Sequence, residues 1–294
     1  MAEHQTFSDF IHNNAVIAKG PPTRYRLRLE VRNLDGKGDD SRLRICTVGT
    51  KDPKKPNRTI LLVGETGSGK SALINSLLNF TVGVKPEDKQ WFEIVDDIKT
   101  NQPESQTINV SVYQIFGFEG KTLPYSLTLI DTPGYGDTRG IEYDAVISRN
   151  LHDLFLSKDG VHEVHAVGLV LKAAENRLSD RLMYSFQSVM SLFGNDMEQK
   201  IVALITHSDG MPPENALQAL EAANIKCAKN EEGSGGQTHA SLRRGKTKSN
   251  TRRTQPPLHS AGESMGDYNP AGGPKWLERE AWFSGGAVVT FQRI

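Results

Sequence analysis

Cysteine is scarce in this sequence, and so are long apolar runs and any excess of charge of one sign. Only Cys46 and Cys227 occur among 294 residues, so we expect no disulfide framework. The longest apolar stretches, such as residues 166–171, fall far short of the roughly 20 residues that a transmembrane helix needs. Basic and acidic residues balance at 35 each, which gives no sign of a nucleic-acid-binding protein. No basic and apolar signal segment starts the chain, so we expect a cytoplasmic protein.

Hydrophobic residues make up 37% of the chain, which is enough for one sizeable domain with extensions. We expect a flexible leader over residues 1–22, a β-hairpin extension over 23–50, a folded domain over 56–230 and a disordered tail over 231–294. The tail is rich in Gly, Ser, Pro, Arg and Thr and shows no helical or strand period before Trp276.

The most informative stretch is G-x-x-x-x-G-K-S at residues 64–71, which follows the apolar run 60–63 and precedes a segment with helical periodicity. Glycines let such a loop turn its N–H groups inward and form an anion nest at a helix N-terminus. Lys70 would reach the outer phosphates of a nucleotide, and the Ser71 hydroxyl would bind Mg²⁺. The residues predicted to line this phosphate-binding loop are Gly64, Glu65, Thr66, Gly67, Ser68, Gly69, Lys70, Ser71 and Ala72.

Before the loop, strict alternation from Tyr25 to Arg32, a turn-rich segment at 35–40 and further alternation over 43–47 predict a hairpin with a basic face. We expect this face to be solvated, and binding to an anionic surface is the alternative. After the loop, residues 82–106 are polar and long, as expected for a first switch segment, although Trp91 and Phe92 suggest that part of it folds back onto the core.

A second motif, Asp131-Thr132-Pro133-Gly134, follows an antiparallel hairpin predicted from strands 108–116 and 125–130. An acidic residue at the end of an apolar strand is placed to hold the Mg²⁺ shell, and Gly134 can offer its N–H to a terminal phosphate. The alternation then continues with a helix at 146–155, a strand at 164–171, a helix at 182–193, a strand at 201–205 and a helix at 217–223. This order predicts a doubly wound α/β fold with a mostly parallel sheet.

The third motif, Thr206-His207-Ser208-Asp209, ends the second strand after the Asp131 loop. A carboxylate there can accept from both adjacent donors of guanine, which adenine lacks. With all three motifs in this order, the chain resembles septin-like GTPases, and most closely the GTPases of immunity-associated proteins and their fish septin-like relatives. The resemblance covers residues 59–230.

The resemblance implies a Ras-like P-loop G domain, Mg²⁺-dependent binding of GTP and GDP, and a homodimer across the nucleotide face. It assigns phosphate binding to residues 64–71, Mg²⁺ and γ-phosphate sensing to Asp131 and Gly134, and base recognition to Asp209, next to Thr206 and His207. The first-switch threonine, a catalytic and Mg²⁺-binding residue together with the catalytic Lys70 and Gly134, is assigned to Thr107 rather than Thr100. The expected partner is a guanine nucleotide, with neither nucleic acid nor a transmembrane segment.

Three departures from the family pattern shape the functional expectation. His207 replaces the lysine that usually packs over the base, although immunity-associated relatives also carry histidine there. Tyr135 stands where Ras-type proteins carry a water-orienting glutamine, so we expect slow hydrolysis of GTP to GDP and phosphate. The family's last strand and helix find no match after Asn230, which suggests a truncated G domain of marginal stability.

Several alternatives stay open. The chain is expected to act as a GTP-dependent switch or dimerisation module, or as a nucleotide-binding scaffold with negligible turnover. An ATPase or kinase is a weaker alternative because it leaves Asp209 without a role. In the tail, residues 287–291 could form an edge strand, and the basic residues of 243–253 could be a nuclear or nucleic-acid signal.

Overall fold

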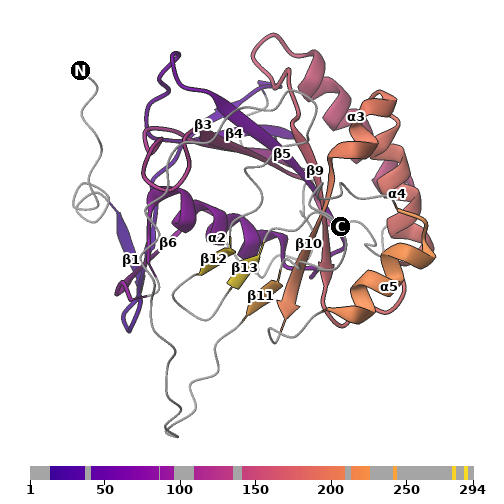
Figure 1. Cartoon of the computed structure of the whole chain (residues 1–294). Helices are drawn as coiled ribbons and strands as arrows, with labels where there is room; N and C mark the ends of the chain where they lie inside the picture. The colour runs from indigo at the N-terminus through magenta and orange to yellow at the C-terminus, as the bar shows by residue number, and fades with distance from the viewer. Residues whose placement is uncertain are drawn as a thin grey trace, which may run out of the picture.

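The computed structural model describes residues 14–36, 41–85, 87–95, 109–134, 141–208 and 213–225, together with three short strands further along the chain (Figure 1). Within these residues no helix is long and apolar enough to cross a membrane. The predicted domain boundaries at residues 22, 50 and 230 stay predictions.

An eight-stranded sheet forms the centre of the molecule, in the order β11-β10-β9-β5-β8-β7-β4-β3 (Figure 1). Its neighbouring strands are parallel except for the pairs β7–β8 and β3–β4, so the sheet is mixed and mostly parallel. The antiparallel hairpin predicted before Asp131 is therefore confirmed as β7 and β8. The strands are β3 (Glu30–Asn33), β4 (Leu43–Val48), β5 (Asn57–Val63), β7 (Val110–Ile115), β8 (Ser126–Asp131), β9 (Ala166–Lys172), β10 (Ile201–Ser208) and β11 (Ser241–Arg243).

Helices cover both faces of this sheet, as the predicted α/β fold requires. On one face α2 (Lys70–Val82) packs Leu73, Leu77 and Leu78 against residues of β5 and β8. On the other face α3 (Ile141–Leu156), α4 (Asp180–Met190) and α5 (Glu214–Ala222) lie side by side and bury a second core (Figure 1). A short 3₁₀ helix, η2 (Asn195–Lys200), leads into β10.

A second, three-stranded sheet stands beside α2 and consists of β1 (Ala15–Ala18), β2 (Thr23–Arg26) and β6 (Gln90–Glu93). Its strand β6 lies in the long polar segment 82–106 and buries Phe92 completely, so part of that segment does fold back onto the core. Residues 96–106 of the predicted switch segment lie outside the described residues.

The prediction of one continuous strand from Tyr25 to Arg32 is wrong, because the chain changes sheets within it. β2 belongs to the small sheet and β3 to the large one. Between them Leu27 is buried, with 3% of its surface exposed, and its N–H donates to the carbonyl of Glu93 in β6. The hairpin itself is present as β3 and β4, but β4 pairs with β7 and makes the hairpin the edge of the main sheet.

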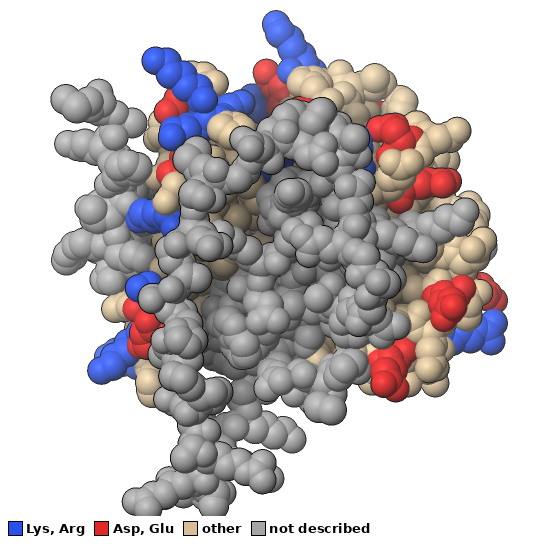
Figure 2. Space-filling model, viewed as in Figure 1, with Lys and Arg blue, Asp and Glu red and all other residues tan. Residues whose placement is uncertain are grey.

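Figure 2 shows Lys and Arg side chains mainly on the upper left of the molecule, where Figure 1 places the N-terminal strands.

Within the stretch 231–294 the structure describes three short strands. β11 pairs in parallel with β10, and β12 (Glu280–Trp282) pairs antiparallel with β13 (Val288–Thr290). β13 falls in the segment 287–291 that the sequence proposes as an edge strand, whereas the strand at the edge of the main sheet beside β10 is β11.

Candidate functional site

The loop between β5 and α2 gathers most of the predicted phosphate-binding residues at the carboxyl end of a central strand. Gly67 and Gly69 have φ angles of 78° and 94°, in the left-handed region that glycine adopts without strain. Gly69 precedes α2 without a side-chain cap, so the first N–H groups of the helix are not satisfied by a capping side chain. This backbone is suited to an anion.

Lys70 folds back over this loop. Its Nζ donates to the carbonyl oxygens of Gly64 at 2.8 Å and Glu65 at 3.1 Å, and the side chain is buried. Burial lowers the pKa of Lys70, while the nearby carboxylates of Asp131 and Glu65 raise it. The ammonium is therefore held among backbone acceptors, where a phosphate oxygen would be a stronger partner.

Asp131 ends β8 directly beside this lysine. Its Oδ1 is buried and has no hydrogen-bond partner among the described residues, although the residue as a whole is partly exposed. Burial raises the pKa of Asp131 to about 6, and the Lys70 ammonium opposes that rise. A buried carboxylate oxygen without a partner costs folding free energy that a bound cation would recover. The oxygen donors of Asp131 and Ser71 fit a hard cation such as Mg²⁺.

The loop after β8 lies against the phosphate-binding loop. The Thr66 hydroxyl donates to the carbonyl of Gly134 at 3.2 Å. A Cβ at Gly134 would stand 2.6 Å from Cα and 2.7 Å from N of Thr66, so only glycine allows this approach. Upstream, the Thr132 hydroxyl donates to the carbonyl of Leu62 at 2.9 Å and fixes the loop to β5.

The end of β10 reaches the same loop from the other side. Thr206 Oγ1 lies 2.5 Å from the carbonyl oxygen of Ser68 and 3.0 Å from Nδ1 of His207. His207 has a φ angle of 55°, and its Cε1 would lie 3.2 Å from a Cβ placed on Gly69. The third motif thus contacts the first, as a base site beside a phosphate site requires.

The structure therefore brings together residues 64–72, Asp131, Gly134, Thr206 and His207. Four residues that the sequence analysis considers for the site, Thr100, Thr107, Tyr135 and Asp209, lie outside the described residues. Their roles, and the ligand roles of the residues that are described, stay predictions.

Comparison with known proteins fits this geometry. Residues 58–227, more than half of the chain, match the AIG1 family. The chain belongs to the AIG1 family. Over 158 residues it is 29% identical to the immune-associated nucleotide-binding protein 13 of Arabidopsis thaliana. The aligned region covers 53% of this chain and 40% of that protein. Over 118 residues it is 34% identical to septin-2B of Xenopus laevis. That aligned region covers 37% of this chain and 30% of septin-2B.

This AIG1-family chain thus spans less than half the length of both relatives. Among solved structures it is similar to Toc33 from Arabidopsis thaliana in complex with Mg²⁺ and GMPPNP. The identity is 16% and the TM-score 0.39, over 58% of this chain and 62% of that one. At that level the likeness says nothing about a shared ligand.

Two sets of contacts in this AIG1-family G domain escaped the sequence analysis. Glu65 accepts a hydrogen bond from the hydroxyl of Ser179, which also accepts from Leu182 N–H and so caps α4. A serine just before an amphipathic segment is the signal that could have revealed the cap. On α2, Asn79 binds the backbone of β6 and Asn75 binds the backbone of the two residues that follow it. The position of these asparagines among the leucines of α2 is the only sequence signal.

Proposed function

We propose that this AIG1-family G domain binds a guanine nucleotide with Mg²⁺ and hydrolyses GTP slowly to GDP and phosphate. The observation that carries the proposal is the pair of buried, opposite charges at the loop. Lys70 is held on two carbonyl oxygens, and Asp131 has one buried carboxylate oxygen without a hydrogen-bond partner in the part of the chain that the structure describes. A triphosphate and a divalent cation would satisfy both groups at once.

In the proposed complex Lys70 exchanges its carbonyl partners for phosphate oxygens, and the N–H groups of the loop bind the same phosphates. Asp131 and Ser71 would hold Mg²⁺, which neutralises charge on the phosphates when it is bound. Gly134 would offer its N–H to the terminal phosphate from the loop that already contacts Thr66. Asp209, one residue beyond the end of β10, would accept from the two donors on the guanine edge.

We expect slow turnover because the residue after Gly134, where Ras-type proteins carry a glutamine that orients the attacking water, is a tyrosine. Hydrolysis adds water to the γ-phosphate and breaks its bond to the β-phosphate oxygen, so a group that orients the water accelerates it. Tyr135, which follows Gly134, cannot act through a carboxamide as glutamine does. Lys70, Mg²⁺ and the loop amides then supply charge stabilisation alone.

The same feature favours a second candidate function, in which GTP is a dimerisation ligand across the nucleotide face and is hardly turned over. The two functions differ in measurable ways. The first predicts phosphate release above background in a single-turnover assay. The second predicts no release above background, together with different oligomeric states in GTP and GDP by light scattering.

Nucleotide binding is tested with fluorescent GTP and GDP in the presence and absence of Mg²⁺. Lys70→Ala removes charge-assisted hydrogen bonds worth about 1.5–3 kcal/mol, so we expect its affinity to fall by roughly 10–100-fold. Lys85→Ala, at an exposed position three residues after the end of α2, is the matched control and should bind as the natural chain does. Equal affinities of the two variants would contradict the proposed site.

A further inference from the structure

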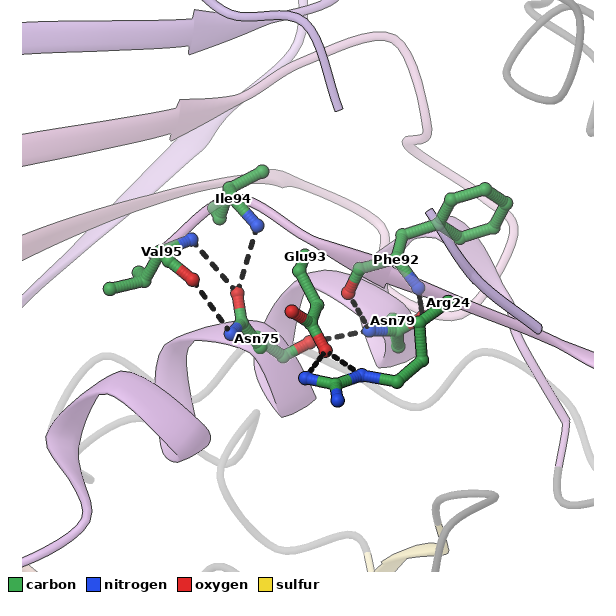
Figure 3. A network of polar contacts seen from close by, with 7 residues as sticks. All are labelled: Arg24, Asn75, Asn79, Phe92, Glu93, Ile94 and Val95. Atoms are coloured by element: carbon green, nitrogen blue, oxygen red, sulfur yellow. Dashed lines mark hydrogen bonds and ion pairs between the residues drawn. The ribbon is translucent and has the colours of Figure 1, made fainter. Parts of the chain in front are cut away.

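β6 is an edge strand, and two asparagine side chains of α2 close the outer side of this strand and of the two residues that follow it, in place of another strand (Figure 3). Asn79 Oδ1 accepts from the N–H of Phe92 at 2.9 Å, and its Nδ2 donates to the carbonyl of Phe92 at 2.7 Å. Asn75 Oδ1 accepts from the N–H groups of Ile94 at 2.9 Å and Val95 at 3.1 Å. The two amides make the bonds that a neighbouring strand would otherwise make.

These contacts are deeply buried. Asn79 is 0% and Asn75 4% exposed, and Phe92 lies in the core beside α2. Asn79 Nδ2 also donates to the backbone carbonyl of Asn75 at 2.7 Å, which fixes the Asn79 side chain against the preceding turn of α2. Because an unpaired buried amide is costly, β6 cannot leave this face of α2 without a large loss of favourable contacts.

The opposite edge of β6 holds the N-terminal strands. Arg24 of β2 pairs with the buried carboxylate of Glu93 at 2.5 Å (Figure 3). The backbone of Glu93 accepts from Leu27 N–H at 2.9 Å, and the rings of Tyr25 and Phe92 lie 5.8 Å apart. Strand β6 therefore links β2 on one side to α2 on the other.

The helix α2 also begins at the phosphate-binding lysine. Lys70 is the first of its 13 residues, and Asn75 and Asn79 lie on its buried side. A helix of this length moves as a unit, so the phosphate loop and the asparagines that hold β6 share one element. A ligand that orders the N-terminus of α2 should therefore also reduce the mobility of β6.

We propose that Asn75 and Asn79 are positioning residues that couple nucleotide binding to the docking of strands β1 and β2. This inference rests on the proposed function, since it needs a ligand at the phosphate loop. Coupling of this kind is reciprocal. Nucleotide tightens the attachment of the N-terminal strands, and a partner that holds those strands raises the affinity for nucleotide.

Hydrogen exchange of the full chain, with and without saturating Mg²⁺·GDP, tests the coupling. Exchange of the β2 and β6 amides should slow by roughly 5–150-fold on binding, the range of typical coupling between sites. Unchanged exchange in β2 and β6 despite bound nucleotide would overturn the inference and leave the proposed function standing. Absence of any nucleotide binding would overturn both.

Variants then assign the coupling to the asparagines. Asn79→Asp keeps the acceptor for Phe92 N–H but loses the donor to its carbonyl, and Asn75→Ala removes the contacts to Ile94 and Val95. Thr81→Val is the matched control, because its buried hydroxyl donates within α2, to Leu77, and not to β6.

At saturating nucleotide we expect the slowing in β2 to fall below about twofold in both asparagine variants, and to persist in the Thr81→Val control. Undiminished slowing in both asparagine variants would overturn their role. Should either variant fail to fold, the exchange of the natural chain still decides whether β2 responds to nucleotide.

Discussion

At the residue scale, a group beside the phosphate-binding loop that is suited to a ligand lowers the stability of the ligand-free fold. Asp131 carries a carboxylate into a buried position beside Lys70, and its Oδ1 makes no hydrogen bond to the residues described. Such a group costs folding free energy in the absence of a ligand, which is common where a binding site is kept ready for a charged partner.

Replacement of Asp131 should therefore change stability and binding in opposite directions. The raised pKa means that the folded state binds the proton more tightly than the unfolded state, so ionised Asp131 destabilises the fold above about pH 6 and not below about pH 4. We expect Asp131→Asn to stabilise the nucleotide-free chain by about 1–3 kcal/mol at pH 7.5 and to abolish Mg²⁺-dependent binding.

Urea unfolding in a metal chelator at pH 7.5 measures this gain, with Asp153→Asn on the exposed side of α3 as the control. A destabilised Asp131→Asn chain would contradict the assignment of an unpaired charge at this position.

His165 gives a pH dependence at the opposite end of the sheet. Its Nδ1 accepts from Thr59 N–H at 3.1 Å, and its Nε2 lies 3.3 Å from the Glu163 carboxylate. Burial lowers the pKa of His165, and Glu163 partly opposes this. Because the unfolded state binds the proton more readily, the contribution of His165 is complete above about pH 6.5 and is lost as the pH falls below it.

We expect the free energy of unfolding to decrease more between pH 7.5 and 5.5 in the natural chain than in His165→Gln. The exposed His162→Gln should follow the natural chain. Parallel profiles for the natural chain and His165→Gln would show that protonation of His165 does not weaken the fold.

At the element scale, Ser179 joins the phosphate loop to α4. Its hydroxyl caps the helix through Leu182 N–H at 3.0 Å and donates to Glu65. We expect Ser179→Ala to cost about 1 kcal/mol of stability through the lost cap, whereas Ser179→Asp keeps a capping acceptor and repels Glu65. Urea unfolding of both, with Ser191→Ala at the other end of α4 as the control, separates the two roles; an unaffected Ser179→Ala chain would refute the cap.

The elements that the sequence predicts well are those whose pattern depends on burial alone. β9 and β10 are continuous apolar runs inside a mostly parallel sheet, and α2 follows an unmistakable loop. The carboxyl ends of β8 and β10 place Asp131 and Thr206 beside the phosphate loop, so this part of the site follows from the order of motifs.

β1, β2 and β6 are harder to predict because their pairing is not local. Alternation runs unbroken from Tyr25 to Arg32, and nothing in that pattern marks the change of sheets at Leu27. β6 is only four residues long, and its outer edge is satisfied by side chains of α2. A polar residue on a helix normally predicts a solvent-exposed side chain. The buried contacts of Asn75 and Asn79 can therefore be recognised only once the fold is known.

At the scale of the whole molecule, the topology determines where a ligand can bind. β5 lies between β8 and β9, and the chain leaves β5 into α2 on one face and β8 into α3 on the other. Open α/β sheets bind ligands at such a switch point, beyond the carboxyl ends of the strands. The phosphate loop, Asp131 and the end of β10 all meet there.

The central claim is that this switch point holds a guanine nucleotide. The most direct measurement is equilibrium titration of the full chain with fluorescent GTP, GDP and ATP in Mg²⁺, beside Asp209→Ala. We expect binding of GTP and GDP but not ATP, and a loss of roughly tenfold or more in Asp209→Ala because a carboxylate bonded to the base is worth about 1.5–3 kcal/mol. Equal binding of ATP and GTP, or no binding of any nucleotide by the folded chain, would contradict the claim.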